Sequence, residues 1–204
     1  MSYRYFALGN SVTLHGCCEY WWNPVGMAAT TAERDYVSLV TAFLRETFGE
    51  AESERYNYAD WERAEDRAAL LPLLEPMLAK APDLITVQLG ENVPGGLQDT
   101  MEADYRRLLS FLHERVPKAK IIVIGDFWDE TRNRIRAVAA DATGCAFVDL
   151  TPFRVDPKYQ CGMGTTVYDA DGGAHTVDHP GVAAHPGDVG MAAIADAVIA
   201  AFRG

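Results

Sequence analysis

The sequence lacks several features that would assign it to particular classes of protein. It has only four cysteines in 204 residues, and none of them shows the Cys-x-x-Cys spacing of a metal site. Basic residues are few, with 18 Lys and Arg against 29 Asp and Glu, so the chain offers no strongly basic face for nucleic acid or an anionic membrane. Its uncharged apolar runs, such as 121–124, are only strand-sized, so we expect no segment that spans a membrane.

The amino terminus also lacks a basic flank followed by an apolar core, so we expect no signal peptide. Without export, free thiols are expected at Cys17, Cys18, Cys145 and Cys161. Hydrophobic residues make up 49% and charged residues 23%, which is ordinary for a globular chain. These properties predict an acidic, cytoplasmic globular protein, and its length fits one domain.

Strand-like and helix-like segments alternate along the chain. The run 121–124 is continuously apolar, as in a strand that is buried on both faces. The helix-like segments carry apolar residues at helical spacing, most clearly over 101–116. This alternation predicts an α/β fold with a parallel sheet and helices on both sides. Strands are expected at 3–8, 55–58, 84–89, 121–124 and 146–150, and helices from 30, from about 61, over 101–116 and 130–140, and around 191–202.

Two local patterns give further expectations. Thr30 is followed by Glu33 in the spacing of a capping box, which predicts that the first helix begins there. The charged stretches 50–55 and 62–67 are typical of solvated faces.

Polar residues follow the first and third expected strands and precede the last helix, at 9–11, 90–92 and 185. In an open parallel sheet, loops at the carboxyl ends of the strands meet and form ligand sites. Ser11 and His185 are the minimum for nucleophilic catalysis, because a hydroxyl needs a base before it can attack a carbonyl. The Asn92 amide could donate to the oxyanion that forms, together with backbone N–H groups.

Three segments in this order resemble the SGNH (GDSL-type) hydrolases, which are serine esterases and lipases. FALGNSVT (6–13) is similar to the first block of that family, QLGEN (88–92) to the third, and HPGDVGM (185–191) to the last. The resemblance implies a three-layer α/β/α fold with a flavodoxin-like, five-stranded parallel sheet, formed by 1–204 as one domain. It also implies that Ser11 is the nucleophile and His185 the base.

The same resemblance implies that Asn92, with Gly90 beside it, lines the oxyanion or substrate site. No cofactor is expected. The predicted activity is hydrolysis of a carboxylic ester, with a small-molecule ester or an acylated carbohydrate as substrate. A non-catalytic binding domain on the same fold and an acyltransferase are the alternatives.

The sequence departs from the family pattern at three places. Asn10 stands where the family usually has Asp, and 57–61 has no glycine to supply the second oxyanion donor. Val182 occupies the position of the catalytic acid, three residues before His185. We therefore expect that Asp178 orients the imidazole, or that the site is a Ser–His dyad. Other candidates for this role are Asp126, Asp149, Glu91, a backbone carbonyl and a water molecule.

The long connections 12–29 and 151–185 carry further candidates. Trp21 and Trp22, next to Tyr20, could stack on a sugar or wall an acyl pocket, or could form a hydrophobic cover. Imidazole and carboxylate groups in 175–185 suit Zn²⁺, but their surroundings are not helical, so we expect no metal. Cys17 and Cys18 lie near His15 and could supply a thiol nucleophile, but buried thiols are usually inert.

Overall fold

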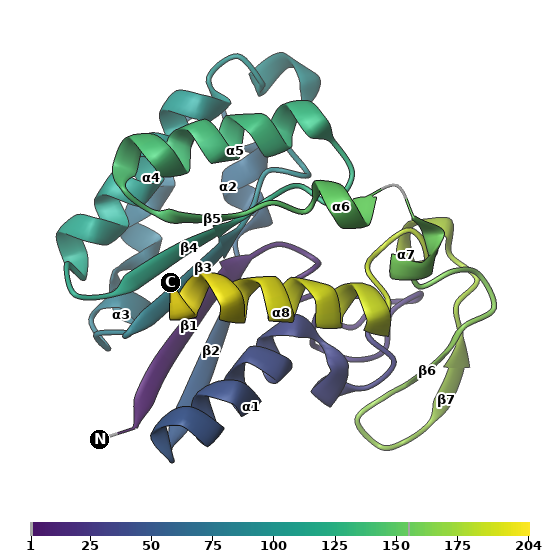
Figure 1. Cartoon of the computed structure of the whole chain (residues 1–204). Helices are drawn as coiled ribbons and strands as arrows, with labels where there is room; N and C mark the ends of the chain where they lie inside the picture. The colour runs from purple at the N-terminus through teal and green to yellow at the C-terminus, as the bar shows by residue number, and fades with distance from the viewer. Residues whose placement is uncertain (1, 155) are drawn as a thin grey trace.

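The computed structural model describes residues 2–154 and 156–204 and contains a five-stranded parallel sheet (Figure 1). The strand order is β2-β1-β3-β4-β5, which is the flavodoxin-like order. The predicted α/β/α fold class is therefore confirmed. The strands are β1 (Tyr3–Gly9), β2 (Ala51–Asn57), β3 (Leu84–Gln88), β4 (Lys120–Ile124) and β5 (Ala146–Val148).

The strands differ in how closely they follow the sequence pattern. Every residue of β3 is buried, as expected of a central strand covered on both faces. β2 begins four residues earlier than the predicted 55–58. It is an edge strand whose Glu52 is exposed, so its charged residues hide the strand pattern in the sequence.

Helices cover both faces of the sheet (Figure 1). α1 (Tyr36–Phe48) and α8 (Asp188–Arg203) pack against each other on one face, and α4 (Met101–Arg115) and α5 (Glu130–Thr143) pack against each other on the opposite face. The short helices α2 (Ala59–Arg63) and α3 (Glu75–Leu78) lie on the α4 side. Each face has its own hydrophobic core, built around Val40, Leu44, Ile194 and Val198 on the α1 face and around Trp61, Tyr105, Leu108 and Leu112 on the other.

The first helix does not begin at Thr30. The segment Ala32–Arg34 is a short 3₁₀ helix, and α1 starts after Asp35. The Asp35 carboxylate accepts a hydrogen bond from the backbone N–H of Ser38, which caps the helix. Asp35 also pairs with Arg55 of β2, so the residue that caps α1 is held by a contact with a distant part of the chain.

The long connection before α8 is ordered by small elements. It contains α6 (Thr151–Arg154), the antiparallel strands β6 (Thr166–Tyr168) and β7 (Ala174–Thr176), and α7 (Pro180–Ala183). Further 3₁₀ helices lie at Ala68–Leu74, Gly95–Leu97 and Pro157–Tyr159. This connection packs on the loop after β1 through a third apolar cluster, which includes Trp21, Val25, Met27, Val167, Val177 and Val182.

The charged stretch 62–67 is a solvated face only in part, because Arg63, Glu65 and Asp66 are exposed but the two ends of the stretch are buried. Glu62 is 0% exposed and Arg67 is 2% exposed. Arg67 Nη1 lies 2.9 Å from Asp104 Oδ2 on α4, so the charge is paired inside the protein. The sequence did not predict the burial of Arg67, because Arg67 and its partner Asp104 lie about forty residues apart in the sequence.

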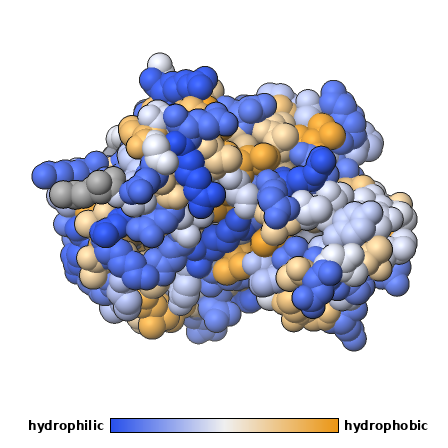
Figure 2. Space-filling model, turned by 90° about the horizontal axis from the view of Figure 1, so that it is seen from below, coloured by the Kyte–Doolittle hydropathy of each residue, from blue (hydrophilic) through white to orange (hydrophobic). Residues whose placement is uncertain are grey.

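On the face shown in Figure 2, hydrophobic residues occur in small separate groups among hydrophilic ones. Among the helices described by the structure, none is both long and apolar enough to cross a membrane.

Candidate active site

The ends of β1 and β3 meet at one edge of the sheet. Gly9, the last residue of β1, is in register with Gln88 of β3. A side chain at Gly9 would collide with Thr13 and with the Gln88 carbonyl, so the tight turn after β1 requires glycine. Ser11 and Asn92 follow these two strands, and both line the same hollow.

Ser11 and His185 are hydrogen-bonded to each other. Ser11 Oγ lies 2.8 Å from His185 Nε2, although the two residues are 174 positions apart. His185 Nδ1 lies 2.6 Å from the backbone carbonyl oxygen of Gly181, which can only accept a hydrogen bond. Nδ1 therefore carries the proton, which leaves Nε2 free to accept the Ser11 hydroxyl proton. This is the tautomer that a general base requires.

The group that orients His185 is a backbone carbonyl. Asp178 is exposed, and the structure describes no hydrogen bond from it to His185. The expectation that Asp178 orients the imidazole is therefore not met. The physical reason is local: the last carbonyls of a helix have no partner within it, and Gly181 lies in the single turn of α7.

Val182 cannot take the role of the acid either. Its side chain is 1% exposed and packs in the apolar cluster with Trp21 and Met27. The helical turn of α7 thus directs residue 182 into the core and leaves the Gly181 carbonyl facing the imidazole.

Burial keeps His185 neutral. Removal from water lowers the pKa of His185 to about 4, and the hydrogen bond to Gly181 only partly opposes this effect. The nearby imidazoles of His15 and His179 lower the pKa further. Trp128 contacts the imidazole edge-on, with ring centroids 5.1 Å apart.

Asn92 is held by a buried carboxylate that the sequence did not suggest. Asn92 Nδ2 donates to Glu62 Oε2 at 2.6 Å, and the Asn92 backbone N–H approaches Glu62 Oε1 at 3.4 Å. Glu62 Oε1 also accepts the Gly90 backbone N–H and the Asn10 side-chain amide, the latter at 2.9 Å. Glu62 therefore joins the loop after β3 to the turn after β1.

Asn10 links this carboxylate to a second one. Asn10 Nδ2 donates to Glu91 Oε2 at 2.6 Å as well as to Glu62. Glu91 pairs with Arg136 at 2.9 Å, and Arg136 pairs with Asp126 at 3.0 Å. Burial raises the pKa of Glu91 to about 7, although Arg136 opposes this rise. Two buried carboxyl groups thus contact Asn10, the residue that precedes Ser11.

Two hollows flank the Ser11–His185 pair. The larger has a volume of about 500 Å³ and the smaller about 290 Å³. Ser11, Asn92 and His185 line both. The smaller is also lined by Trp128 and Arg132. The larger adds mainly polar side chains, namely His15, Tyr20, Asn57, Asp60, Arg63 and His179.

The segment 57–61, which has no glycine, does not offer the backbone N–H of Ala59 as a second oxyanion donor. Ala59 lines the larger hollow, but its backbone N–H donates to Asn57 Oδ1 at 3.0 Å. By contrast, no acceptor in the described parts of the chain takes the backbone N–H of Ser11. That group is available to a ligand.

Three predicted substrate contacts lie elsewhere. Trp21 is 1% exposed inside the apolar cluster, so it cannot stack on a ligand. Trp22 stacks on His175, with ring centroids 4.4 Å apart, and does not line either hollow. Gly90 adopts a φ of 126° and packs on Arg136, and its N–H is taken by Glu62. Of the three aromatics in this segment, Tyr20 lines the larger hollow.

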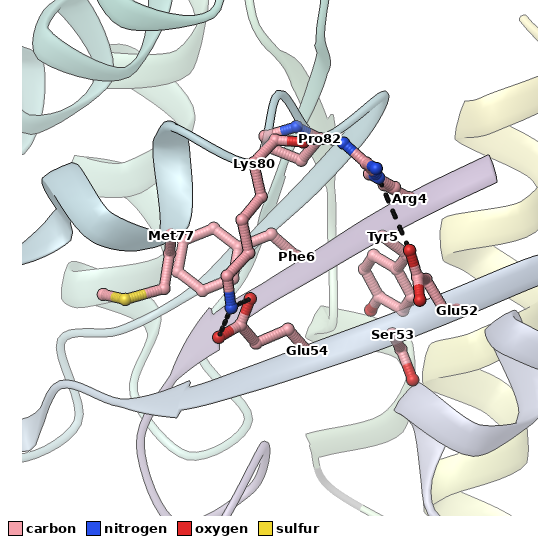
Figure 3. Close-up of a pocket in the computed structure, with 9 residues that line it drawn as sticks. All are labelled: Arg4, Tyr5, Phe6, Glu52, Ser53, Glu54, Met77, Lys80 and Pro82. Atoms are coloured by element: carbon pink, nitrogen blue, oxygen red, sulfur yellow. Dashed lines mark hydrogen bonds and ion pairs between the residues drawn. The ribbon is translucent and has the colours of Figure 1, made fainter. Parts of the chain in front are cut away.

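The structure offers neither a metal site nor a second catalytic hollow among its described residues. In the described residues, no three His, Cys, Asp or Glu side chains are arranged to hold a metal ion. A hollow of about 300 Å³ lies beside the first halves of β1 and β2 (Figure 3). Its charged side chains pair with each other, Lys80 with Glu54 at 2.8 Å and Arg4 with Glu52 at 3.4 Å.

No family model and no curated protein matches this sequence. Solved structures of esterases share its fold. A two-domain esterase active on acetylated mannans aligns with a TM-score of 0.61 and 16% identity, over 99% of this chain and 48% of that one. The chain thus spans about half the length of that esterase.

Two further esterase structures align over nearly their full length. A variant of an acetyl xylan esterase from Geobacillus stearothermophilus has a TM-score of 0.57 and 17% identity, over 98% of this chain and 95% of that one. A psychrotrophic esterase from Pseudoalteromonas sp., inhibited by monoethylphosphonate, has a TM-score of 0.58 and 11% identity, over 98% and 96%. These similarities show a shared fold, the one implied by the resemblance to SGNH hydrolases.

Proposed function

We propose that the protein is a serine hydrolase that cleaves carboxylic esters. The observation that carries this proposal is the 2.8 Å hydrogen bond between Ser11 Oγ and His185 Nε2. It joins a nucleophile to a neutral base in the correct tautomer, beside an amide that can donate to an oxyanion. The esterase fold supports the same reaction class.

The reaction proceeds through an acyl-enzyme. Ser11 Oγ attacks the ester carbonyl carbon while His185 Nε2 takes the hydroxyl proton, and the carbonyl electrons move onto oxygen. Asn92 Nδ2 and the Ser11 backbone N–H donate to that oxyanion. When the tetrahedral intermediate collapses, the C–O bond to the alcohol breaks and His185 returns the proton to it. Water then attacks the acyl-Ser11 ester by the same route.

The substrate we propose is a short acyl group on a carbohydrate. The larger hollow presents amide, imidazole, carboxylate and guanidinium groups, which can pair with sugar hydroxyls, and Tyr20 adds an aromatic edge. A polar lining of this kind does not favour a long acyl chain. Two of the esterases with this fold act, by their descriptions, on acetylated mannans and acetyl xylan.

A comparison of substrates tests the reaction and its site. We expect hydrolysis of aryl acetates and acetylated sugars by the wild type, with release of acetate. Ser11→Ala should lower kcat by about 10⁴-fold or more with an unchanged circular dichroism spectrum, because the nucleophile is lost and the fold is not. Wild-type activity in Ser11→Ala would contradict the proposal.

We also propose that the chain works in the cytoplasm and that 1–204 form one domain. Cys17 and Cys18 are free thiols that are exposed and not buried as expected, and free thiols suit a reducing compartment. The sheet takes strands from most of the chain, and α8 packs back on α1. Cell fractionation tests the first proposal, and a single cooperative unfolding transition tests the second.

A further inference from the structure

We propose that Glu62 is a positioning residue, which fixes the side-chain amide of Asn92 so that its nitrogen donates to the oxyanion. This inference rests on the proposed ester hydrolysis. It adds a residue that lies in none of the three motif segments, since Glu62 belongs to the short helix α2.

The side-chain amide of Asn92 has a defined orientation. A carboxylate can only accept hydrogen bonds, so the group that faces Glu62 Oε2 at 2.6 Å must be the Asn92 nitrogen and not its oxygen. Nδ2 carries two protons, and Glu62 takes one of them. In the described structure no protein acceptor takes the second, and Asn92 lines the hollows that contain Ser11.

The contact between Glu62 and Asn92 is rigid. Glu62 is 0% exposed and receives N–H donors from Asn10, Gly90 and Asn92. A buried carboxylate with several donors cannot rotate without leaving at least one of them unpaired, which is costly. The donor amide is therefore preorganised before substrate arrives, which is the condition for oxyanion stabilisation.

The hydrogen bonds of position 10 explain why it is Asn in this chain. Asn10 Nδ2 donates to both Glu62 and Glu91, and Asn10 Oδ1 accepts the Val12 backbone N–H at 3.3 Å. An aspartate would keep the contact to Val12 but would place a third carboxylate against two others. Asn10 and Glu62 therefore form a matched pair, in which the amide at 10 is required by the carboxylate at 62.

A double-mutant cycle between Glu62 and Asn92 tests the inference. Asn92→Ala should lower kcat by about 10²–10³-fold, because it removes one oxyanion donor. Glu62→Gln should lower kcat by about 10–100-fold, with little change in KM, because its amide opposes either Asn92 Nδ2 or the Gly90 N–H. In the Asn92→Ala background, Glu62→Gln should lower kcat by less than about threefold, since its effect passes through Asn92.

Asp104→Asn serves as a matched control, because Asp104 is also a largely buried, paired carboxylate but lies on α4 outside both hollows. It should lower thermal stability without changing kcat. If Glu62→Gln does not fold, Glu62→Asp replaces it in the cycle, because the shorter side chain keeps the charge but withdraws the oxygen from Asn92. Equal fold-losses from the Glu62 substitution in both backgrounds would overturn the inference and assign Glu62 a structural role.

A second readout does not depend on activity. The side-chain amide signal of Asn92 in a ¹H–¹⁵N spectrum should show one proton shifted by the contact to Glu62, and this shift should disappear in the Glu62 variant. An unchanged Asn92 signal would also overturn the inference. Failure of the proposed function is distinguishable, because it would appear as a wild type that hydrolyses no ester while the Asn92 signal still responds to Glu62.

Discussion

The candidate site has two halves that are held by different means: a base half around His185 and a charged half around Asn92. His185 is oriented by the uncharged Gly181 carbonyl, whereas Asn92 is oriented by the buried Glu62 carboxylate. Asn10 links Glu62 to Glu91, and Glu91 pairs with Arg136 and through it with Asp126, so the group that orients Asn92 belongs to a buried charge network, whereas the group that orients His185 is uncharged. Buried charge thus positions the oxyanion donor Asn92, while desolvation keeps the base His185 neutral.

The largest effect should come from adding a carboxylate to the base half at position 182, where a Ser–His–Asp triad would have its acid. Val182→Asp places a carboxylate in an apolar cluster, three residues before His185. We expect the free energy of unfolding to fall by about 3 kcal/mol or more, because a carboxylate would be buried among apolar side chains, without a gain in kcat, because Gly181 already accepts from His185 Nδ1. Urea unfolding and kcat on an aryl acetate measure both.

Val189→Asp provides the control for this substitution, since Val189 is exposed on the first turn of α8. It should change stability by only a few tenths of a kcal/mol. A stable Val182→Asp variant with raised kcat would show that the base half accepts charge after all.

The second effect concerns pH. Because burial lowers the pKa of His185 to about 4, the imidazole stays neutral, and competent as a base, from neutral pH down to about that value. We expect kcat/KM to lose activity as the pH falls through about 4, rather than through 6.5, where an ordinary histidine titrates. Initial rates between pH 3.5 and 8, corrected for unfolding at low pH, give the profile.

An acidic limb with a midpoint between pH 6 and 7 would contradict this prediction. The titration of Glu91 must be distinguished from that of His185 in the pH profile, because burial raises the pKa of Glu91 to about 7. A loss of kcat/KM with a midpoint near pH 7 that is absent in Glu91→Gln would be assigned to Glu91, in the charged half of the site.

The smallest effect is expected at Asp178. Its exposed side chain makes no described contact with His185, so Asp178→Asn should keep kcat within about twofold of the wild type. Parallel assays of the two proteins on one substrate decide this. A loss of about 10⁴-fold, as seen when a triad loses its acid, would mean that Asp178 moves onto the imidazole during the reaction.

The fold was predictable where local patterns decide it. The continuous apolar runs at 84–89 and 121–124 correspond to β3 and β4, and the helical stripe over 101–116 corresponds to α4. Ser11, Asn92 and His185 could be singled out because they lie at ends of elements, where loops of a parallel sheet converge.

What the sequence could not predict depends on contacts between distant residues. Glu62 is charged and lies beside other charged residues, so its pattern is that of a surface; only Asn10, Gly90 and Asn92, brought together by the sheet, explain its burial. One signal was present, because an Asn side chain at position 10 can donate to carboxylates, which an ionised Asp cannot do. The role of Gly181 carried no side-chain signal at all, since its carbonyl does the work.

Covalent labelling tests whether Ser11 is a nucleophile that His185 activates. The wild-type protein is incubated with a fluorophosphonate, digested, and analysed by mass spectrometry, with Ser11→Ala as the control. We expect one phosphonylated site on the peptide that contains Ser11, formed at a rate that falls as His185 is protonated, and no label in Ser11→Ala. An unlabelled wild type, or equal labelling of the two proteins, would contradict it and leave a binding domain on an esterase fold.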